Sequence, residues 1–128
     1  MKQEDKDLLL RDLCARLPYG VKCYKMIFKP ELAEEVICML RNGSHNCVQL
    51  GTFLYRLEHI KPYLFPLSSM TEEQSMEFAL LQVNTHKDGF LYVCDCANMM
   101  KWLLKNHFDI YGLIEKGLAI DCTNLNIY

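Results

Sequence analysis

The sequence predicts an α+β fold with an N-terminal helix, a small antiparallel sheet and a helical C-terminal half. Three observations predict it: helix-spaced leucines near the start, the hairpin signal Asn42-Gly43, and a helix-start signal at Thr71. The 128 residues suit one domain with one core. We therefore predict a single domain over residues 1–128, made of a helix plus small sheet (1–61), a connector (62–71) and a mainly helical part (72–128).

The N-terminal helix is predicted from about Glu4 to Leu17. Leucines at positions 9, 13 and 17 recur at a spacing of four, which places them on one side of a helix. Pro18 disfavours helical geometry at the residue before it, and Gly20 permits the turn into the next segment. Leu10 and Cys14 widen this apolar side, so we expect an amphipathic helix.

The segment from Val21 to Phe28 is rich in β-branched and aromatic residues and is predicted to be extended. Residues 30–41 fit either a helix that begins at a proline or a loop followed by a strand. We choose the strand, because Asn42-Gly43 joins two apolar runs as a hairpin turn does. Residues 52–60 fit a strand or a short helix equally well, and both alternatives stay open.

The connector is predicted to leave the sheet. Pro62 and Pro66 cannot donate hydrogen bonds to a strand ladder, so the segment between them should cross to the second half of the molecule. Thr71 and Gln74 fit a capping box, and two glutamates after Thr71 suit the positive end of a helix. A helix should therefore begin at about residue 72.

The C-terminal half is predicted to hold three helices, over about 72–83, 95–108 and 110–116, with a short strand over 90–94. Asp95 and Asp109 are the expected caps of the second and third helices. The tail from residue 120 to 128 should lie on the surface of the domain. The residues expected to be buried are Met76, Ala79, Leu80 and Val83 in the first helix, and Met99, Met100, Leu103 and Leu104 in the second.

The charge balance argues against nucleic acid as a partner. The chain carries 14 Lys and Arg residues against 16 Asp and Glu residues. Affinity for nucleic acid needs many Lys and Arg side chains on one surface. Lys22, Lys25 and Lys29 do not form one stripe on a strand. We identify no leader and no apolar segment of membrane-spanning length, so we expect a cytoplasmic protein with no membrane contact.

The seven cysteines are scattered, which suits reduced thiols used as small apolar side chains. Neither of the two Cys/His groups has the spacing of a zinc site, so we predict no metal and no cofactor. These groups are Cys94, Cys96 and His107, and Cys38, His45 and Cys47. No pattern of a nucleophile with its base identifies a catalytic residue.

Aromatic residues gather near His107, which lies where a helix is expected to end. A protonated imidazole there would face the negative end of the helix dipole, which is a structural role. Trp102, Phe108 and Tyr111 are close in sequence and suit a core or a subunit contact. The apolar helices are therefore also compatible with a homodimer.

Three blocks of the chain carry a resemblance: "KDLLLRDLCARLPYGVK", "HIKPYLFPLSSMTEEQ" and "WLLKNHFDIYGLIEKGLA". In these blocks the sequence resembles a family of small uncharacterised proteins encoded by gut anaerobic bacteria and their prophages. The family has no assigned activity, so the resemblance implies no catalytic residue. The stretch from Cys23 to Glu58 resembles the family's variable, strand-rich part, which implies a fixed framework that carries a changeable surface.

These observations give three hypotheses for function. The first is a non-enzymatic phage or prophage accessory protein that binds a host protein through a surface within Ile27 to Arg56. The second is a binding or sequestering protein for a small ligand such as a nucleotide, for which four side chains would supply charge and stacking: Lys22, Lys25, Tyr24 and Tyr55. The third is an enzyme of unknown class. The candidate binding surface consists of Lys22, Tyr24, Lys25, Tyr55 and Arg56.

Overall fold

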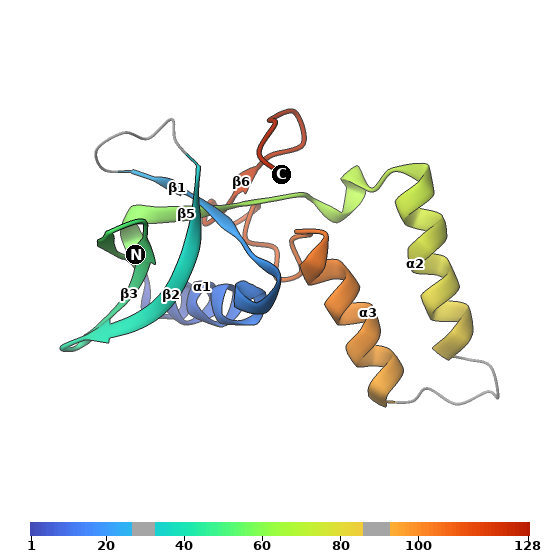
Figure 1. The fold of residues 1–128 in the computed structure, drawn as a ribbon, viewed down its shortest axis with the longest axis horizontal. Helices are drawn as coiled ribbons and strands as arrows, with labels where there is room; N and C mark the ends of the chain where they lie inside the picture. The colour runs from blue at the N-terminus through green and yellow to red at the C-terminus, as the bar shows by residue number, and fades with distance from the viewer. Residues whose placement is uncertain (27–32, 86–92) are drawn as a thin grey trace.

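The structure is a computed structural model that describes residues 1–26, 33–85 and 93–128, and the side chains of all of these except 82–85 and 93–95. Within these residues it is an α+β fold, as predicted, with one mixed sheet in the order β4-β3-β2-β1-β5-β6 (Figure 1). The strands are β1 (Lys22–Lys25), β2 (Glu34–Asn42), β3 (His45–Leu50), β4 (Phe53–Arg56), β5 (Ile60–Leu64) and β6 (Ile120–Asp121). The helices are α1 (Gln3–Arg16), α2 (Glu72–Thr85) and α3 (Val93–Lys105).

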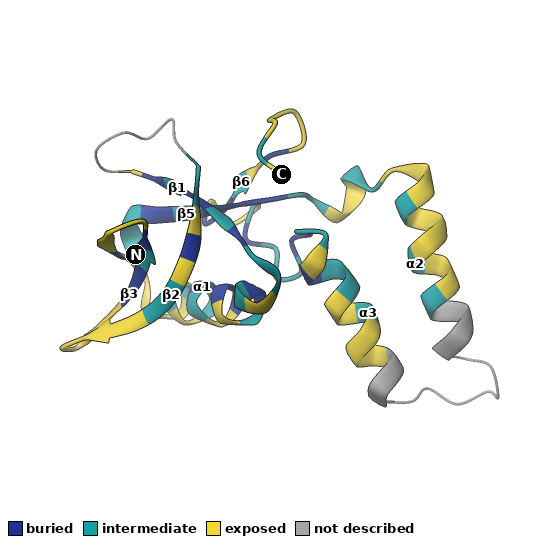
Figure 2. Ribbon diagram, in the orientation of Figure 1, coloured by how far each residue is buried: buried dark blue, intermediate teal, exposed yellow. Residues whose placement is uncertain are grey.

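Helix α1 confirms the predicted N-terminal helix and covers one face of the sheet. Leu9 and Leu13 are fully buried there, against strand residues such as Val48 and Ile60. Apolar burial is the main favourable contribution to folding, so this contact between helix and sheet forms the core. In Figure 2 the buried segments of the strands and of α1 gather where the two layers meet.

The predicted hairpin is confirmed as β2 and β3. Asn42 pairs with His45, so Gly43 and Ser44 form a two-residue turn in which Gly43 takes a φ of +64°. The alternative helix is therefore excluded for residues 34–41, while residues 30–32 lie outside the described part. Both alternatives for 52–60 occur in succession, because β4 is followed by a single 3₁₀ turn over Leu57–His59.

The connector prediction is wrong for Tyr63 and Leu64, because Ile60–Leu64 forms β5 inside the sheet. The Met26 amide donates to the His59 carbonyl, and backbone groups of successive residues point alternately toward and away from a neighbouring strand. Pro62, opposite Cys23, therefore directs its missing donor away from β1. The parallel strand β6 pairs only with Tyr63 and Leu64, so the proline costs the ladder no hydrogen bond.

The helical C-terminal half is found only in part. The capping box is confirmed, since Thr71 and Gln74 exchange side-chain hydrogen bonds with each other's amides at 3.0 and 3.1 Å. Helix α3 begins at Val93, so Asp95 lies inside the helix and is not its cap. The strand prediction for 90–94 is wrong for residues 93 and 94, which are helical, and residues 90–92 lie outside the described part. The tail, expected on the surface, supplies β6 to the sheet.

The last predicted helix is replaced by turns, although its expected cap is present. Asp109 accepts hydrogen bonds from the amides of Leu113 and Ile114 at 2.9 and 3.0 Å. Gly112, three residues after the cap, has a φ of +70°, which interrupts helical geometry within the first turn. Leu118 nevertheless folds back and donates its amide to the Leu113 carbonyl, which buries both leucines.

The burial prediction for α2 is wrong, because Met76 and Leu80 are 65% and 64% exposed and Ala79 is exposed. Figure 1 shows the reason: α2 stands away from the sheet, with α3 between it and α1. Among the described residues, α2 is therefore packed on the side that carries Phe78, which contacts Trp102 of α3. The side chain of Val83, also in α2, lies outside the described part. In α3 the burial prediction is confirmed for Leu104 and wrong for Met100, which is 44% exposed, while Met99 and Leu103 are half-buried.

A buried ion pair ties α1 to the segment after α3. Arg16 donates from Nε and Nη2 to both carboxylate oxygens of Asp12, at 2.8 and 2.9 Å, and from Nη2 to the Phe108 carbonyl at 2.6 Å. Both side chains are completely buried. A charge left alone in such a place would be strongly unfavourable, so each partner requires the other.

We predict that Asp12→Leu and Arg16→Met each lower the free energy of unfolding by about 3–5 kcal/mol, because each leaves one buried charge unpaired. The double variant should lose clearly less than the sum of the two single variants. Urea denaturation of the four proteins measures the coupling energy. Additive losses would contradict the pairing.

Candidate functional site

The predicted surface residues divide between the two faces of the sheet. Cys23 is fully buried under α1, so its neighbours Lys22 and Tyr24 point to the outer face, which α1 does not cover. Lys25 and Tyr55 point to the inner face and are buried. The structure therefore brings together two separate pairs and does not bring these four side chains to one place.

The inner pair is held by a neighbouring acid. Lys25 Nζ lies 2.6 Å from Glu34 Oε1 and 5.9 Å from the centre of the Tyr55 ring. The hydrogen bond to Glu34 raises the pKa of Lys25 above its ordinary value. Lys25 is therefore a cation that is already paired, and its role here is to join the strands.

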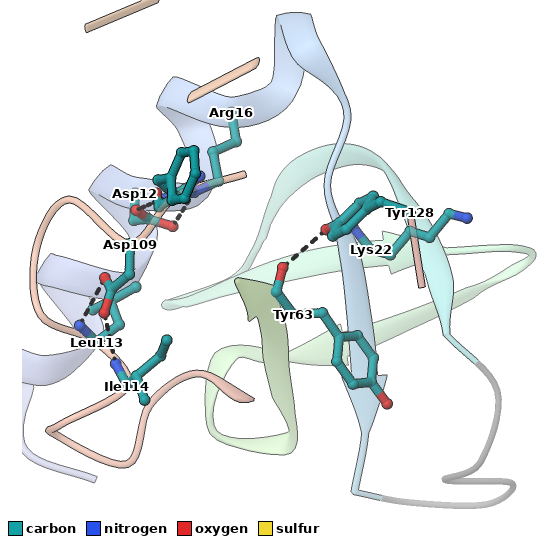
Figure 3. A network of polar contacts seen from close by, with 9 residues as sticks. Asp12, Arg16, Lys22, Tyr63, Asp109, Leu113, Ile114 and Tyr128 are labelled. Atoms are coloured by element: carbon teal, nitrogen blue, oxygen red, sulfur yellow. Dashed lines mark hydrogen bonds and ion pairs between the residues drawn. The ribbon is translucent and has the colours of Figure 1, made fainter. Parts of the chain in front are cut away.

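The outer pair meets the C-terminal residue. The Lys22 amide donates to the Tyr128 hydroxyl at 2.8 Å, and that hydroxyl donates to the Tyr63 carbonyl at 3.0 Å (Figure 3). Lys22 and Tyr63 stand opposite each other where β1 and β5 would exchange a backbone hydrogen bond. The tyrosine hydroxyl takes the place of that bond and bridges the two strands.

The amine of Lys22 is used in the same contact. Its Nζ donates to the Ile127 carbonyl at 2.9 Å and lies 5.8 Å from the centre of the Tyr128 ring. Tyr24 packs edge-on against Tyr63, with ring centres 6.4 Å apart. Lys22 thus holds the C-terminal residues against the sheet, while Tyr24 contacts β5.

His107 lies on the other side of Tyr128, with ring centres 3.5 Å apart and planes inclined by 8°. It ends α3 in the left-handed conformation, with a φ of 64°, and the amides of His107 and Phe108 bond back to Leu104 and Leu103. Within the described residues its Nδ1 atom is buried without a hydrogen-bond partner. Among the described residues His107 is the one non-glycine residue with a positive φ, a conformation that side chains rarely adopt.

Burial lowers the pKa of His107 to about 4, and the positive charges of Arg16 and Lys22 act in the same direction. The imidazole is therefore neutral at physiological pH. A protonated imidazole that faces the negative end of the helix, the structural role considered from the sequence, is therefore disfavoured. Loss of water and the charges of Arg16 and Lys22 lower the pKa by more than the helix dipole raises it.

Metal and nucleophile chemistry find no support in the described side chains. No group of three His, Cys, Asp or Glu residues there could hold a metal ion. Cys38 donates to Gln49 Oε1 at 3.3 Å. Burial raises the pKa of the Cys122 thiol to about 11 and that of Cys23 as well, so neither is a thiolate at neutral pH. No described helix is long and apolar enough to cross a bilayer.

An apolar surface on the outer face of the sheet was not identified from the sequence. Strand register places Leu40, Leu54 and Arg56 on this face, and the two leucines are 43% and 47% exposed. Ile37, in the irregularity of β2, is 59% exposed. We call these four residues the β2–β4 patch. The run "VICML" is apolar throughout, so a period of two could not assign its faces.

We predict that Tyr128→Phe lowers the free energy of unfolding by about 1–3 kcal/mol, because it leaves the Lys22 amide and the Tyr63 carbonyl without their shared partner. Urea denaturation measures the change. Tyr24→Phe is the matched control, since no hydrogen bond of its hydroxyl is seen in the described part of the chain. Equal losses in both variants would refute the bridging role.

A second prediction concerns pH. The pKa of His107 is about 4 in the fold against 6.5 ordinarily, so between these values the unfolded chain binds a proton that the folded chain does not. Stability should therefore fall as the pH is lowered through this window. His107→Asn, which keeps the left-handed conformation accessible, should flatten that dependence. His45→Asn, at an exposed position, is the control; identical pH profiles of wild type and His107→Asn would disprove the assignment.

Comparison with known proteins adds no relative. The chain matches no protein-family model, no curated protein sequence and no solved structure. Its function is therefore argued from the chemistry of its own surface.

Proposed function

We propose that the chain is a non-enzymatic protein-interaction module that binds a host protein through the β2–β4 patch. The observation that carries the proposal is the exposure of Ile37, Leu40 and Leu54, at 59%, 43% and 47%, on two strands of one sheet. Leu40 and Leu54 lie on the same face, on the two strands that flank β3, and Ile37 lies three residues before Leu40 on β2. Exposed apolar side chains on one sheet are typical of protein contacts. Arg56 lies on the same face as Leu54, two residues away. Arginine, like Trp and Tyr, is enriched among the residues that contribute most to protein contacts.

The location of the patch agrees with the sequence argument. It lies within Ile27 to Arg56, the expected binding surface, and so within the stretch from Cys23 to Glu58 that resembles the family's variable part. The framework around it is held by internal contacts, such as the Arg16–Asp12 pair and the Tyr128 bridge. A role as a phage or prophage accessory protein follows from that resemblance and is part of the proposal.

Binding of a small ligand such as a nucleotide is the weaker alternative. Its four expected contact residues lie as two pairs on opposite faces of the sheet, and Lys25 is already paired with Glu34. A small ligand needs polar groups that converge in a concave site. A homodimer stays a further expectation, for which the β2–β4 patch would also be suitable.

We predict that Leu54→Asp abolishes retention of the host partner. Affinity purification from host lysate should recover one protein with the wild type and at least about tenfold less of it with the variant, because a buried apolar contact becomes a buried charge. Leu67→Asp is a matched control, since Leu67 is 49% exposed and lies outside the patch. Melting temperatures show whether each variant is folded.

Two results would contradict this function. Recovery of the same proteins with Leu54→Asp as with the wild type would show that the patch is not the contact. A nucleotide that raises the melting temperature at saturation, and does so equally in Leu54→Asp, would favour the small-ligand alternative.

A further inference from the structure

Helix α2 presents a second apolar surface, separate from the β2–β4 patch. Its inner side contacts α3: Phe78 packs on Trp102 with ring centres 5.4 Å apart, and Trp102 Nε1 donates to Glu77 Oε2 at 3.2 Å. Its outer side carries Met76 and Leu80, four residues apart and 65% and 64% exposed. Residues at this spacing share one side of a helix. Figure 2 shows α2 exposed along most of its described length.

The outer side of α2 is acidic as well as apolar. Glu72 precedes Met76 by four residues, so it continues the same line, and Glu73 lies in the neighbouring line. Glu77 follows Glu73 in that line and turns toward Trp102. All three glutamates are exposed, and the sequence of α2 contains no Lys, Arg or His. We call the surface formed by Glu72, Glu73, Met76 and Leu80 the α2 face.

The negative charge restricts what can cover the α2 face. An anionic membrane or a nucleic acid would be repelled. Symmetric pairing with α2 of a second copy would place these carboxylates near one another, which is unfavourable. A helix with apolar residues at spacings of three and four, flanked by Lys or Arg, complements both the two apolar side chains and the charges.

The helix is also held ready for such a contact. The capping box at Thr71 and Gln74 fixes its first turn, and Trp102 holds its inner side. A surface that is already ordered loses little conformational freedom on binding. We propose that the α2 face is a docking site for a basic amphipathic helix of a partner protein, a role that does not depend on the β2–β4 patch.

The test is a fluorescence-anisotropy titration of the full chain against a labelled synthetic peptide of Leu and Lys, about four helical turns long and amphipathic. Met76→Gln/Leu80→Gln should weaken binding at least about tenfold. Glu72→Gln/Glu73→Gln should weaken it and should also reduce its dependence on salt between about 0.05 M and 0.5 M. The control Met100→Gln changes a 44% exposed methionine on α3 and should leave binding unchanged.

Other results would overturn the proposal. Equal binding of a scrambled peptide of the same composition would show non-specific attraction only. No binding at millimolar peptide, or binding unaffected by Met76→Gln/Leu80→Gln, would remove the site. Sedimentation that shows concentration-dependent assembly, lost in Met76→Gln/Leu80→Gln and in Met100→Gln, would identify a second copy of the chain, through α3 with its Lys101 and Lys105, as the occupant instead.

Discussion

The buried guanidinium of Arg16 is the contact on which the rest of the arrangement depends. It holds Asp12 on its own helix and the Phe108 carbonyl 92 residues later. Burial raises the pKa of Asp12 even though Arg16 lies beside it, so loss of water outweighs the attraction of the pair. The main effect of the pair is therefore to fix where the segment after α3 lies against α1.

That segment then completes the sheet from the side of β5. Phe65 and Phe108 form a parallel bridge, in which the Phe65 amide donates to the His107 carbonyl and the Asp109 amide donates to the Phe65 carbonyl. Further on, β6 pairs with β5, and the Tyr128 hydroxyl joins β1 to β5. The C-terminal residues thus satisfy backbone groups that the strands themselves leave open, which is why this tail contributes to the fold rather than only lying on it.

The same arrangement leaves two surfaces without an internal partner among the described residues. Helix α2 is held through Trp102, which packs on Phe78 and stacks on Phe108 at 5.7 Å, so its outer side stays exposed. The outer face of β2 and β4 is exposed because α1 covers the other face only. The proposed roles in protein binding follow from the exposure of these two surfaces and from their different chemistry. The β2–β4 patch carries an arginine, and the α2 face carries glutamates.

Local signals in the sequence determined what is local in the structure. The leucine spacing of α1, the turn at Gly43 and the capping box at Thr71 depend on residues a few positions apart, so they were predictable. The tertiary structure decided which faces are covered. Met76 and Leu80 have the spacing of core residues, but whether a helix side is buried depends on what is placed against it. Pro62 could join a strand because its neighbours are Cys23 on one side and no strand on the other, and the neutral His107 depends on Arg16, which is distant in sequence and near in space.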